Sequence, residues 1–136
     1  MQIAGADHAN WRVKELERSL HFYCDILGLE TFGTEAYRDD ERAFVSVRVS
    51  TEFTLHLSPD PALEPHYAAS DNHLALVVEG VAPDALRARL ERAGLSIERS
   101  SEQALGARGN GVALYVRDPD GYLIELKIYG SYSDKS

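Results

Sequence analysis

The sequence lacks several features that define particular classes of protein. Cys24 is the only cysteine, so no disulfide can form within the chain, and a reducing compartment is expected. No cluster of lysine and arginine is present, which argues against nucleic acid as a partner. No apolar run approaches the roughly 20 residues of a membrane span. Asp7, His8 and Asn10 interrupt the apolar character of the N-terminal region, so we expect no secretion signal and a cytoplasmic location.

Charge of one sign prevails in this chain. Acidic residues outnumber basic ones 22 to 14, which gives a formal net charge of -8 over 136 residues. An acidic surface favours solubility and repels anionic membranes and polyphosphates. The length suits one compact domain with its own core. We therefore expect neither a membrane nor nucleic acid as the partner.

The two halves of the chain follow the same order of predicted elements, a strand, a helix and three more strands. Apolar periodicity places the first set at residues 7–13, 15–27, 30–37, 42–49 and 52–57. The second set lies at residues 72–78, a helix that begins at Pro83, and residues 96–103, 112–117 and 122–128. Each half is therefore a βαβββ module. A proline-containing linker at about residues 59–71 separates module one, about 6–58, from module two, about 72–129.

Matched positions support the repeat. Gly28-Leu29 and Gly94-Leu95 end the two predicted helices in the same way, with a glycine C-cap followed by an apolar residue. His8 and His73 are 65 positions apart, and His56 and Glu125 are 69 apart, so each pair occupies equivalent strands. The predicted fold is α+β, a single domain over residues 1–136. Two tandem modules have curved mixed sheets that form a metal-binding cleft, with the helices outside.

Strand alternation places one polar residue of the ligand type on the second face of each of four strands. These residues are His8, His56, His73 and Glu125, and each lies opposite an apolar face. Two histidines and one carboxylate are the smallest set that holds a divalent metal while leaving positions open for substrate. The alternative is that these residues face solvent. Histidines on strands are commonly solvated, and Glu125 would then be an ordinary polar residue in an alternating strand. If that face is buried, the carboxylate needs a cation, a metal or a proton.

The sequence resembles the vicinal oxygen chelate superfamily over nearly its whole length. This superfamily groups glyoxalases, fosfomycin-resistance proteins, bleomycin-binding proteins, epimerases and extradiol dioxygenases. The resemblance is carried by residues 7–8 (DH), 20–23 (LHFY), 27–29 (LGL), 72–75 (NHLA) and, most strongly, 114–126 (LYVRDPDGYLIEL). The last stretch is specific for the superfamily and does not select one member.

The resemblance implies one divalent metal per site, held by His8, His73 and Glu125. Glyoxalase-like members add a fourth ligand at the position of His56, often a carboxylate or amide, so His56 is interpreted as a ligand, a substrate contact or a base. The metal is iron, manganese, nickel, cobalt or zinc. The resemblance also implies a small-molecule substrate and a homodimer, in which the site lies within one chain or is shared between two.

The resemblance leaves several activities open. The favoured one is a glyoxalase-like lyase or isomerase, in which Glu125 or His56 moves a proton next to a carbonyl through a metal-bound enediolate. An extradiol-type dioxygenase would use His8, His73 and Glu125 as an iron triad, with Tyr115 ten residues before Glu125 as a further catalytic residue. A fosfomycin-resistance-like enzyme would open an epoxide with a thiol or water. A bleomycin-type binding protein would sequester a cationic drug without catalysis.

Overall fold

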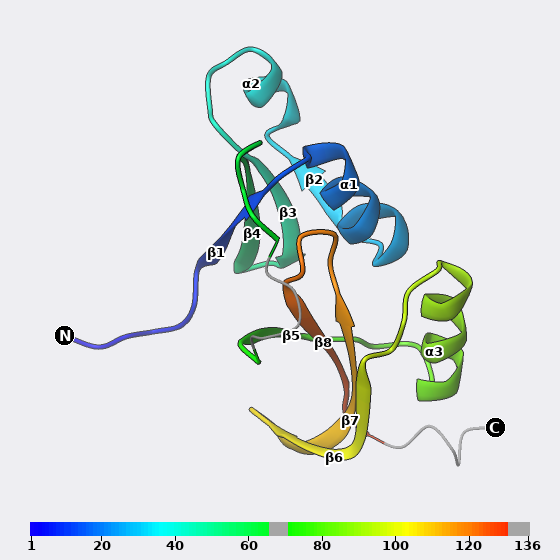
Figure 1. Cartoon of the computed structure of the whole chain (residues 1–136). Helices are drawn as coiled ribbons and strands as arrows, with labels where there is room; N and C mark the ends of the chain where they lie inside the picture. Colours follow the sequence, from blue (N-terminus) through cyan, green and yellow to red (C-terminus); the bar gives the residue numbers. More distant parts are fainter. Residues whose placement is uncertain (66–70, 131–136) are drawn as a thin grey trace. The chain divides into compact units, whose positions relative to one another are not determined.

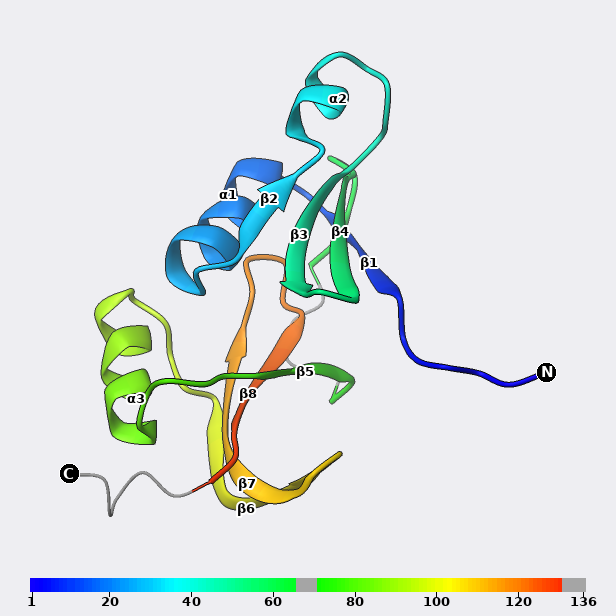
Figure 2. The same cartoon turned by 180° about the vertical axis from the view of Figure 1, so that it is seen from behind.

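The computed structural model describes residues 1–65 and 71–130. The chain forms two compact units, Met1–Pro65 and residues 66–136. Residues 66–70, within the predicted linker, lie outside the described residues. Each unit contains a four-stranded mixed sheet and helical segments (Figures 1 and 2), as the α+β prediction with two βαβββ modules required.

The first unit is described in full. Its elements are β1 (His8–Val13), α1 (Leu16–Leu20), η1 (His21–Ile26), β2 (Glu30–Phe32), α2 (Thr34–Arg38), β3 (Val45–Ser50) and β4 (Phe53–Pro59). The strand order is β1-β4-β3-β2, with β1 parallel to β4 and the other neighbours antiparallel. The predicted helix at 15–27 is thus an α-helical turn that continues as a π-helix, and α1 packs near β4.

Apolar residues of β3 and β4 form the core of the first unit on one face of the sheet. Val45, Val47, Leu55 and Leu57 have no exposed surface, and they alternate with polar residues along their strands. The indole Nε1–H of Trp11 donates a hydrogen bond of 3.0 Å to the hydroxyl of the buried Tyr23, which ties η1 to β1. The opposite face is therefore left for the polar residues of the same strands.

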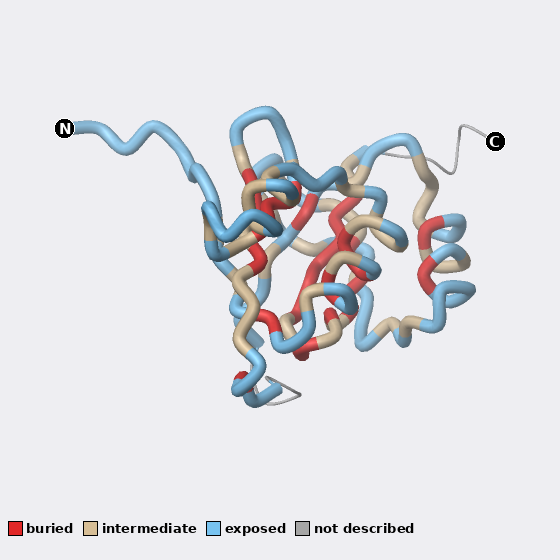
Figure 3. Tube along the Cα trace, turned by 90° about the horizontal axis from the view of Figure 1, so that it is seen from above, coloured by how far each residue is buried: buried red, intermediate tan, exposed pale blue. Residues whose placement is uncertain are grey.

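The second unit repeats this plan. Its described elements are β5 (His73–Val77), α3 (Pro83–Arg92), β6 (Arg99–Gly106), β7 (Gly109–Arg117) and β8 (Leu123–Ile128). The strand order is β5-β8-β7-β6, with β5 parallel to β8. Leu86 and Leu90 are the buried residues of α3, and every residue of β8 is buried. Figure 3 shows such buried stretches in red, in contrast to the exposed segment that precedes β1.

Strand register confirms the equivalence of the two halves. In the first unit His56 lies opposite Asn10 on β1 and Ser46 on β3. In the second unit Glu125 lies opposite Ala75 on β5 and Tyr115 on β7. His56 and Glu125 therefore occupy the same position in their respective sheets, as their offset predicted.

The predicted strand at residues 30–37 was wrong beyond Phe32, because α2 takes its second half. Gly33 separates the two elements with a φ of 77°, a conformation that suits glycine. The guanidinium of Arg42 also occupies the space into which a Cβ at Gly33 would project. The side chain of Arg42 therefore packs against Gly33, where the chain passes from β2 to α2.

Two strand boundaries in the second unit also differ from the prediction. β6 begins at Arg99 rather than at residue 96, and β7 begins at Gly109 rather than at residue 112. The hairpin pairs its strands out to Gly106 and Gly109, which stand opposite each other, and this explains the early start of β7. Of the helices in the described part of the chain, none has the length and apolar character to cross a membrane.

Candidate functional site

His8 and His56 lie side by side on the polar face of the first sheet. Their ring centroids are 4.5 Å apart, and they come from the neighbouring strands β1 and β4. His8 Nδ1 donates a hydrogen bond of 2.7 Å to the Asp7 carboxylate. Because a carboxylate can only accept, the proton of the neutral His8 ring lies on Nδ1, and Nε2 keeps its lone pair. His8 is exposed, so this lone pair can serve as a metal ligand.

His56 is half-buried and has a different environment. Its Nδ1 lies 2.8 Å from the hydroxyl of Ser46, and its ring lies 4.3 Å from that of Phe44. Burial is the main cause that lowers the pKa of His56 below its ordinary value, and His8 and Arg42 act in the same direction against Asp7. Ser46 stands opposite His56 on the neighbouring strand β3, and alternation along a single strand does not identify this contact.

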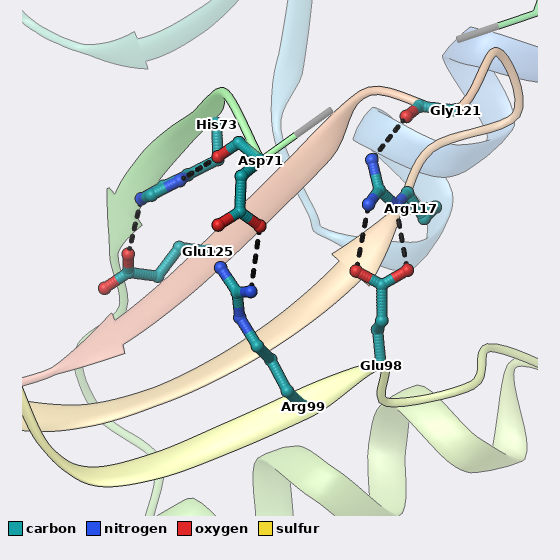
Figure 4. A network of polar contacts seen from close by, with 7 residues as sticks. All are labelled: Asp71, His73, Glu98, Arg99, Arg117, Gly121 and Glu125. Atoms are coloured by element: carbon teal, nitrogen blue, oxygen red, sulfur yellow. Dashed lines mark hydrogen bonds and ion pairs between the residues drawn. The ribbon is translucent and has the colours of Figure 1, made fainter. Parts of the chain in front are cut away.

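His73 and Glu125 form the corresponding pair in the second unit, as Figure 4 shows. His73 Nε2 lies 3.0 Å from Glu125 Oε1, and His73 Nδ1 lies 2.9 Å from the backbone carbonyl oxygen of Asp71. A carbonyl oxygen can only accept, so Nδ1 carries a proton. In the neutral ring Nε2 then presents a lone pair to a carboxylate oxygen. Two such acceptors at this distance need a proton or a metal ion between them.

Glu125 has little access to water. Glu125 is 5% exposed, and the neighbouring Lys127 is 2% exposed. The Nζ of Lys127 lies 3.6 Å from Glu125 Oε2. Lys127 Nζ also donates to the carbonyl of Ala104. A buried carboxylate is costly unless it is paired, and here a histidine and a lysine flank its two oxygens. The sequence analysis did not identify Lys127. The signal that could have found it is its position two residues after Glu125 in β8, which puts both side chains on the same face.

Tyr115, the other predicted catalytic residue, lies across from Glu125 on β7. It is 9% exposed, and its ring is 5.5 Å from that of His73. Burial raises the pKa of Tyr115 above its ordinary value, and its hydrogen bond to the Glu125 carboxylate raises it further, while Arg99 opposes both. The phenol therefore remains protonated near neutral pH, and it can donate a hydrogen bond beside the carboxylate.

Arg117 and the turn that follows it connect β7 to β8. The guanidinium makes two hydrogen bonds of 3.0 Å to the two carboxylate oxygens of Glu98 and a third to the Gly121 carbonyl (Figure 4). Asp118 accepts from the backbone N–H groups of Asp120 and Tyr122. Gly121 has a φ of 90°, which the turn requires. This turn determines where β8 begins, and hence where Glu125 lies.

The structure thus brings the four predicted residues together as two pairs, one in each unit. Among its described residues, neither unit by itself gathers three side chains of the kinds that hold a metal. The meeting of the two pairs at one point stays a prediction. Within each pair the contact is direct, at 4.5 Å between ring centroids for His8 and His56 and at 3.0 Å for His73 and Glu125.

Comparison with known proteins identifies the family. The model of the Glyoxalase/Bleomycin resistance protein/Dioxygenase superfamily matches residues 5–126. The chain therefore belongs to this superfamily, which confirms the resemblance of its sequence.

Individual relatives fall into more than one branch. A probable lactoylglutathione lyase from Synechocystis sp. is 31% identical over 123 residues, which cover 88% of this chain and 91% of the relative. The metallothiol transferase FosB from Shouchella clausii is 25% identical over 124 residues, which cover 91% of this chain and 80% of the relative. The fosfomycin resistance protein FosX from Listeria monocytogenes, solved with Mn(II), has a TM-score of 0.70 at 18% identity and covers 93% of this chain and 90% of that one. This last likeness shows the fold alone.

Proposed function

We propose that this protein is a divalent-metal enzyme whose metal ligands are His8, His73 and Glu125. The observation that carries the proposal is the 3.0 Å approach of His73 Nε2 to Glu125 Oε1, while His73 Nδ1 is committed to the Asp71 carbonyl. A divalent cation satisfies both lone pairs at once, and it offsets the cost of a buried carboxylate. A histidine that binds a metal through one ring nitrogen typically donates a hydrogen bond from the other, and this bond orients the ring.

His8 fits the same donor set. Its Nδ1 donates to Asp7, so its Nε2 keeps a lone pair, as the Nε2 of the neutral His73 ring does. Two imidazole nitrogens and one carboxylate oxygen suit iron, manganese, nickel, cobalt or zinc. Because His8 belongs to the first unit and the other two ligands to the second, the proposed site needs both units. A homodimer is part of this proposal, with the site formed within one chain or shared between two.

The bound ion would supply a Lewis acid for two neighbouring oxygens of a small substrate. The residues of this chain would then transfer the substrate proton. Glu125 carries the carboxylate that accepts a proton from the carbon next to the substrate carbonyl, and Lys127 stabilises its charged form from 3.6 Å. Tyr115 donates a hydrogen bond beside it, because the raised pKa of Tyr115 keeps the phenol protonated.

The reaction that these roles support is that of a glyoxalase-like lyase or isomerase. The relative named a probable lactoylglutathione lyase, at 31% identity over most of both chains, favours this branch. The assay is the formation of the lactoylglutathione thioester from methylglyoxal and glutathione. Activity that is lost on chelation and restored by one added metal would support the proposal.

A second candidate is the transfer of a thiol to an epoxide. The similarity to the metallothiol transferase FosB favours it, at lower identity. It would use the same metal ligands, so a metal analysis cannot separate it from the first candidate. Incubation of the metal-loaded protein with fosfomycin and a small thiol, followed by mass spectrometry of the adduct, separates the two.

The first experiment is elemental analysis of protein purified without a histidine tag or chelator. Wild type is compared with His73→Ala and Glu125→Gln, and His21→Ala is the control, because His21 is an exposed histidine paired with Asp25 outside the sheets. We expect about one transition metal per chain in wild type and in the control, and a strong loss in the other two. Iron would direct the assays toward an extradiol-type dioxygenase.

Protein that holds no metal even after reconstitution would overturn the proposal. A non-catalytic, bleomycin-type binding protein would then be the better explanation, and the acidic net charge of -8 suits a cationic drug. Equal metal in wild type and His73→Ala would place the metal elsewhere in the chain.

A further inference from the structure

The three histidines on the two sheets differ in what holds their Nδ1 atoms. His8 and His73 face oxygens that can only accept, the Asp7 carboxylate and the Asp71 carbonyl. His56 faces the hydroxyl of Ser46 at 2.8 Å, and a hydroxyl can donate as well as accept. The direction of that one hydrogen bond decides which nitrogen of His56 carries the proton.

The surroundings of Ser46 settle the direction. Ser46 has no exposed surface, so its hydroxyl cannot donate to water. Arg42 Nη2 lies 2.7 Å from Ser46 Oγ and can only donate, so it takes one of the lone pairs of Ser46. Among the described residues, the only acceptor left for the Ser46 proton is His56 Nδ1. If Nδ1 were protonated, a buried hydroxyl would lack an acceptor, which costs about 1–3 kcal/mol.

The neighbouring side chains hold this arrangement in place. The Arg42 guanidinium stacks 4.0 Å above the ring of Phe44, and that ring in turn packs against His56 at 4.3 Å. Gly33 leaves the space that Arg42 fills. The donation from Arg42 polarises the Ser46 hydroxyl and makes it a stronger donor to His56. The chain of donors therefore runs in one direction, from Arg42 through Ser46 to His56.

We propose that Arg42 and Ser46 hold His56 as the neutral tautomer with its proton on Nε2, and that His56 acts as a hydrogen-bond donor to a substrate oxygen. In this state Nδ1 is occupied and Nε2 has no lone pair. His56 is then neither a fourth metal ligand nor a general base, although its position in the sheet is that of Glu125. Arg42 and Ser46 are positioning residues, since they act through His56.

The substrate class follows from the kind of donor, and this part rests on the proposed function. A neutral imidazole N–H stabilises an oxygen that gains negative charge during the reaction, and it does not give up its proton. The group that His56 recognises is therefore a carbonyl oxygen or a similar acceptor next to the reacting carbon. Placement beside the proposed ligand His8, at 4.5 Å between rings, suits such an oxygen.

The test is the tautomeric state of His56 by long-range ¹H–¹⁵N correlation NMR on protein labelled with [¹⁵N]histidine and freed of metal. The His56 signals are assigned from their loss in His56→Gln. For His56 we expect the pattern of a neutral ring with the proton on Nε2, whereas the neutral ring of His8 has its proton on Nδ1. In Ser46→Ala the Nδ1–H form of His56 should appear. Ser58→Ala is the matched control, because Ser58 donates to Asn10 on the same pair of strands.

A wild-type spectrum with the His56 proton on Nδ1 would overturn the inference without reference to any variant. Addition of Zn²⁺ gives a second, independent reading. We expect the Nε2 signals of His8 and His73 to shift and the His56 Nε2 proton to remain, so loss of that proton would make His56 a ligand and the inference wrong. If Zn²⁺ shifts no histidine, the proposed function fails, while the spectrum of the metal-free protein still decides the inference.

Discussion

His8 and His56 pack with their rings 4.5 Å apart, yet their Nδ1 atoms contact opposite kinds of partner. The carboxylate of Asp7 accepts from His8, and the hydroxyl of Ser46 donates to His56. Neighbouring histidines on one face therefore present a lone pair and a proton, respectively, at Nε2. This difference separates a metal ligand from a substrate contact, which residue type alone does not do.

Asp7→Ala should weaken metal binding without removing a ligand. Asp7 orients His8 and keeps the proton on Nδ1, and the loss of such second contacts costs about 10- to 100-fold in metal affinity. Because Asp7 is 91% exposed, we expect the lower part of that range. The measurement is Zn²⁺ affinity by competition with a chromophoric chelator. Asp25→Ala is the control, since it removes a similar pair at His21; equal losses in both variants would contradict the prediction.

Lys127→Met should destabilise the protein by about 3 kcal/mol, because it leaves a buried carboxylate with one cationic partner fewer. Lys127 is 2% exposed and lies 3.6 Å from Glu125 Oε2, and methionine fills much of the same space. Urea unfolding measures the change in the free energy of unfolding. Arg92→Met, on the exposed face of α3, should change it by less than about 0.5 kcal/mol. A neutral result for Lys127→Met would show that its charge has no stabilising role.

Gly111→Ala should destabilise the second unit. A Cβ at Gly111 would lie 2.6 Å from the backbone carbonyl oxygen of Ile128 and 3.1 Å from Lys127 Cε. A backbone atom in a sheet cannot move aside without cost, so we expect a loss of about 2 kcal/mol. Gly5→Ala is the control, since a Cβ there meets nothing within 4 Å. Thermal unfolding of the two variants checks this, and similar midpoints would refute it.

Cys24 should react slowly with iodoacetamide in the folded protein. Burial raises the pKa of the Cys24 thiol, and the charge of Asp25 raises it further, so less thiolate is present at pH 8 than in the unfolded chain. The rate should rise as the pH increases beyond the ordinary range of a thiol. Asp25→Asn should speed alkylation at pH 8 by roughly twofold, because it removes the nearby negative charge. An unchanged rate in that variant would show that burial alone controls the thiol.

Much of this architecture was accessible from the sequence. Period-two alternation put His56 and Glu125 on the polar faces of their strands, and the strand register places them there. The glycine C-caps at Gly28 and Gly94 ended the two helices as predicted. These features are local, because they depend on neighbours a few residues apart, and repetition of the pattern in the second half revealed the tandem units.

Other features depended on residues that are distant in the chain. The proton positions of the histidines follow from partners such as Ser46 for His56, and the pairing of Lys127 with Ala104 follows from the path of a hairpin. Periodicity indicates the face on which a side chain lies, but it does not identify the atom that the side chain contacts. The sequence by itself determined the family, the repeated fold and the set of candidate ligands. Only the tertiary structure decided the direction of each hydrogen bond, because that requires burial and partners in three dimensions.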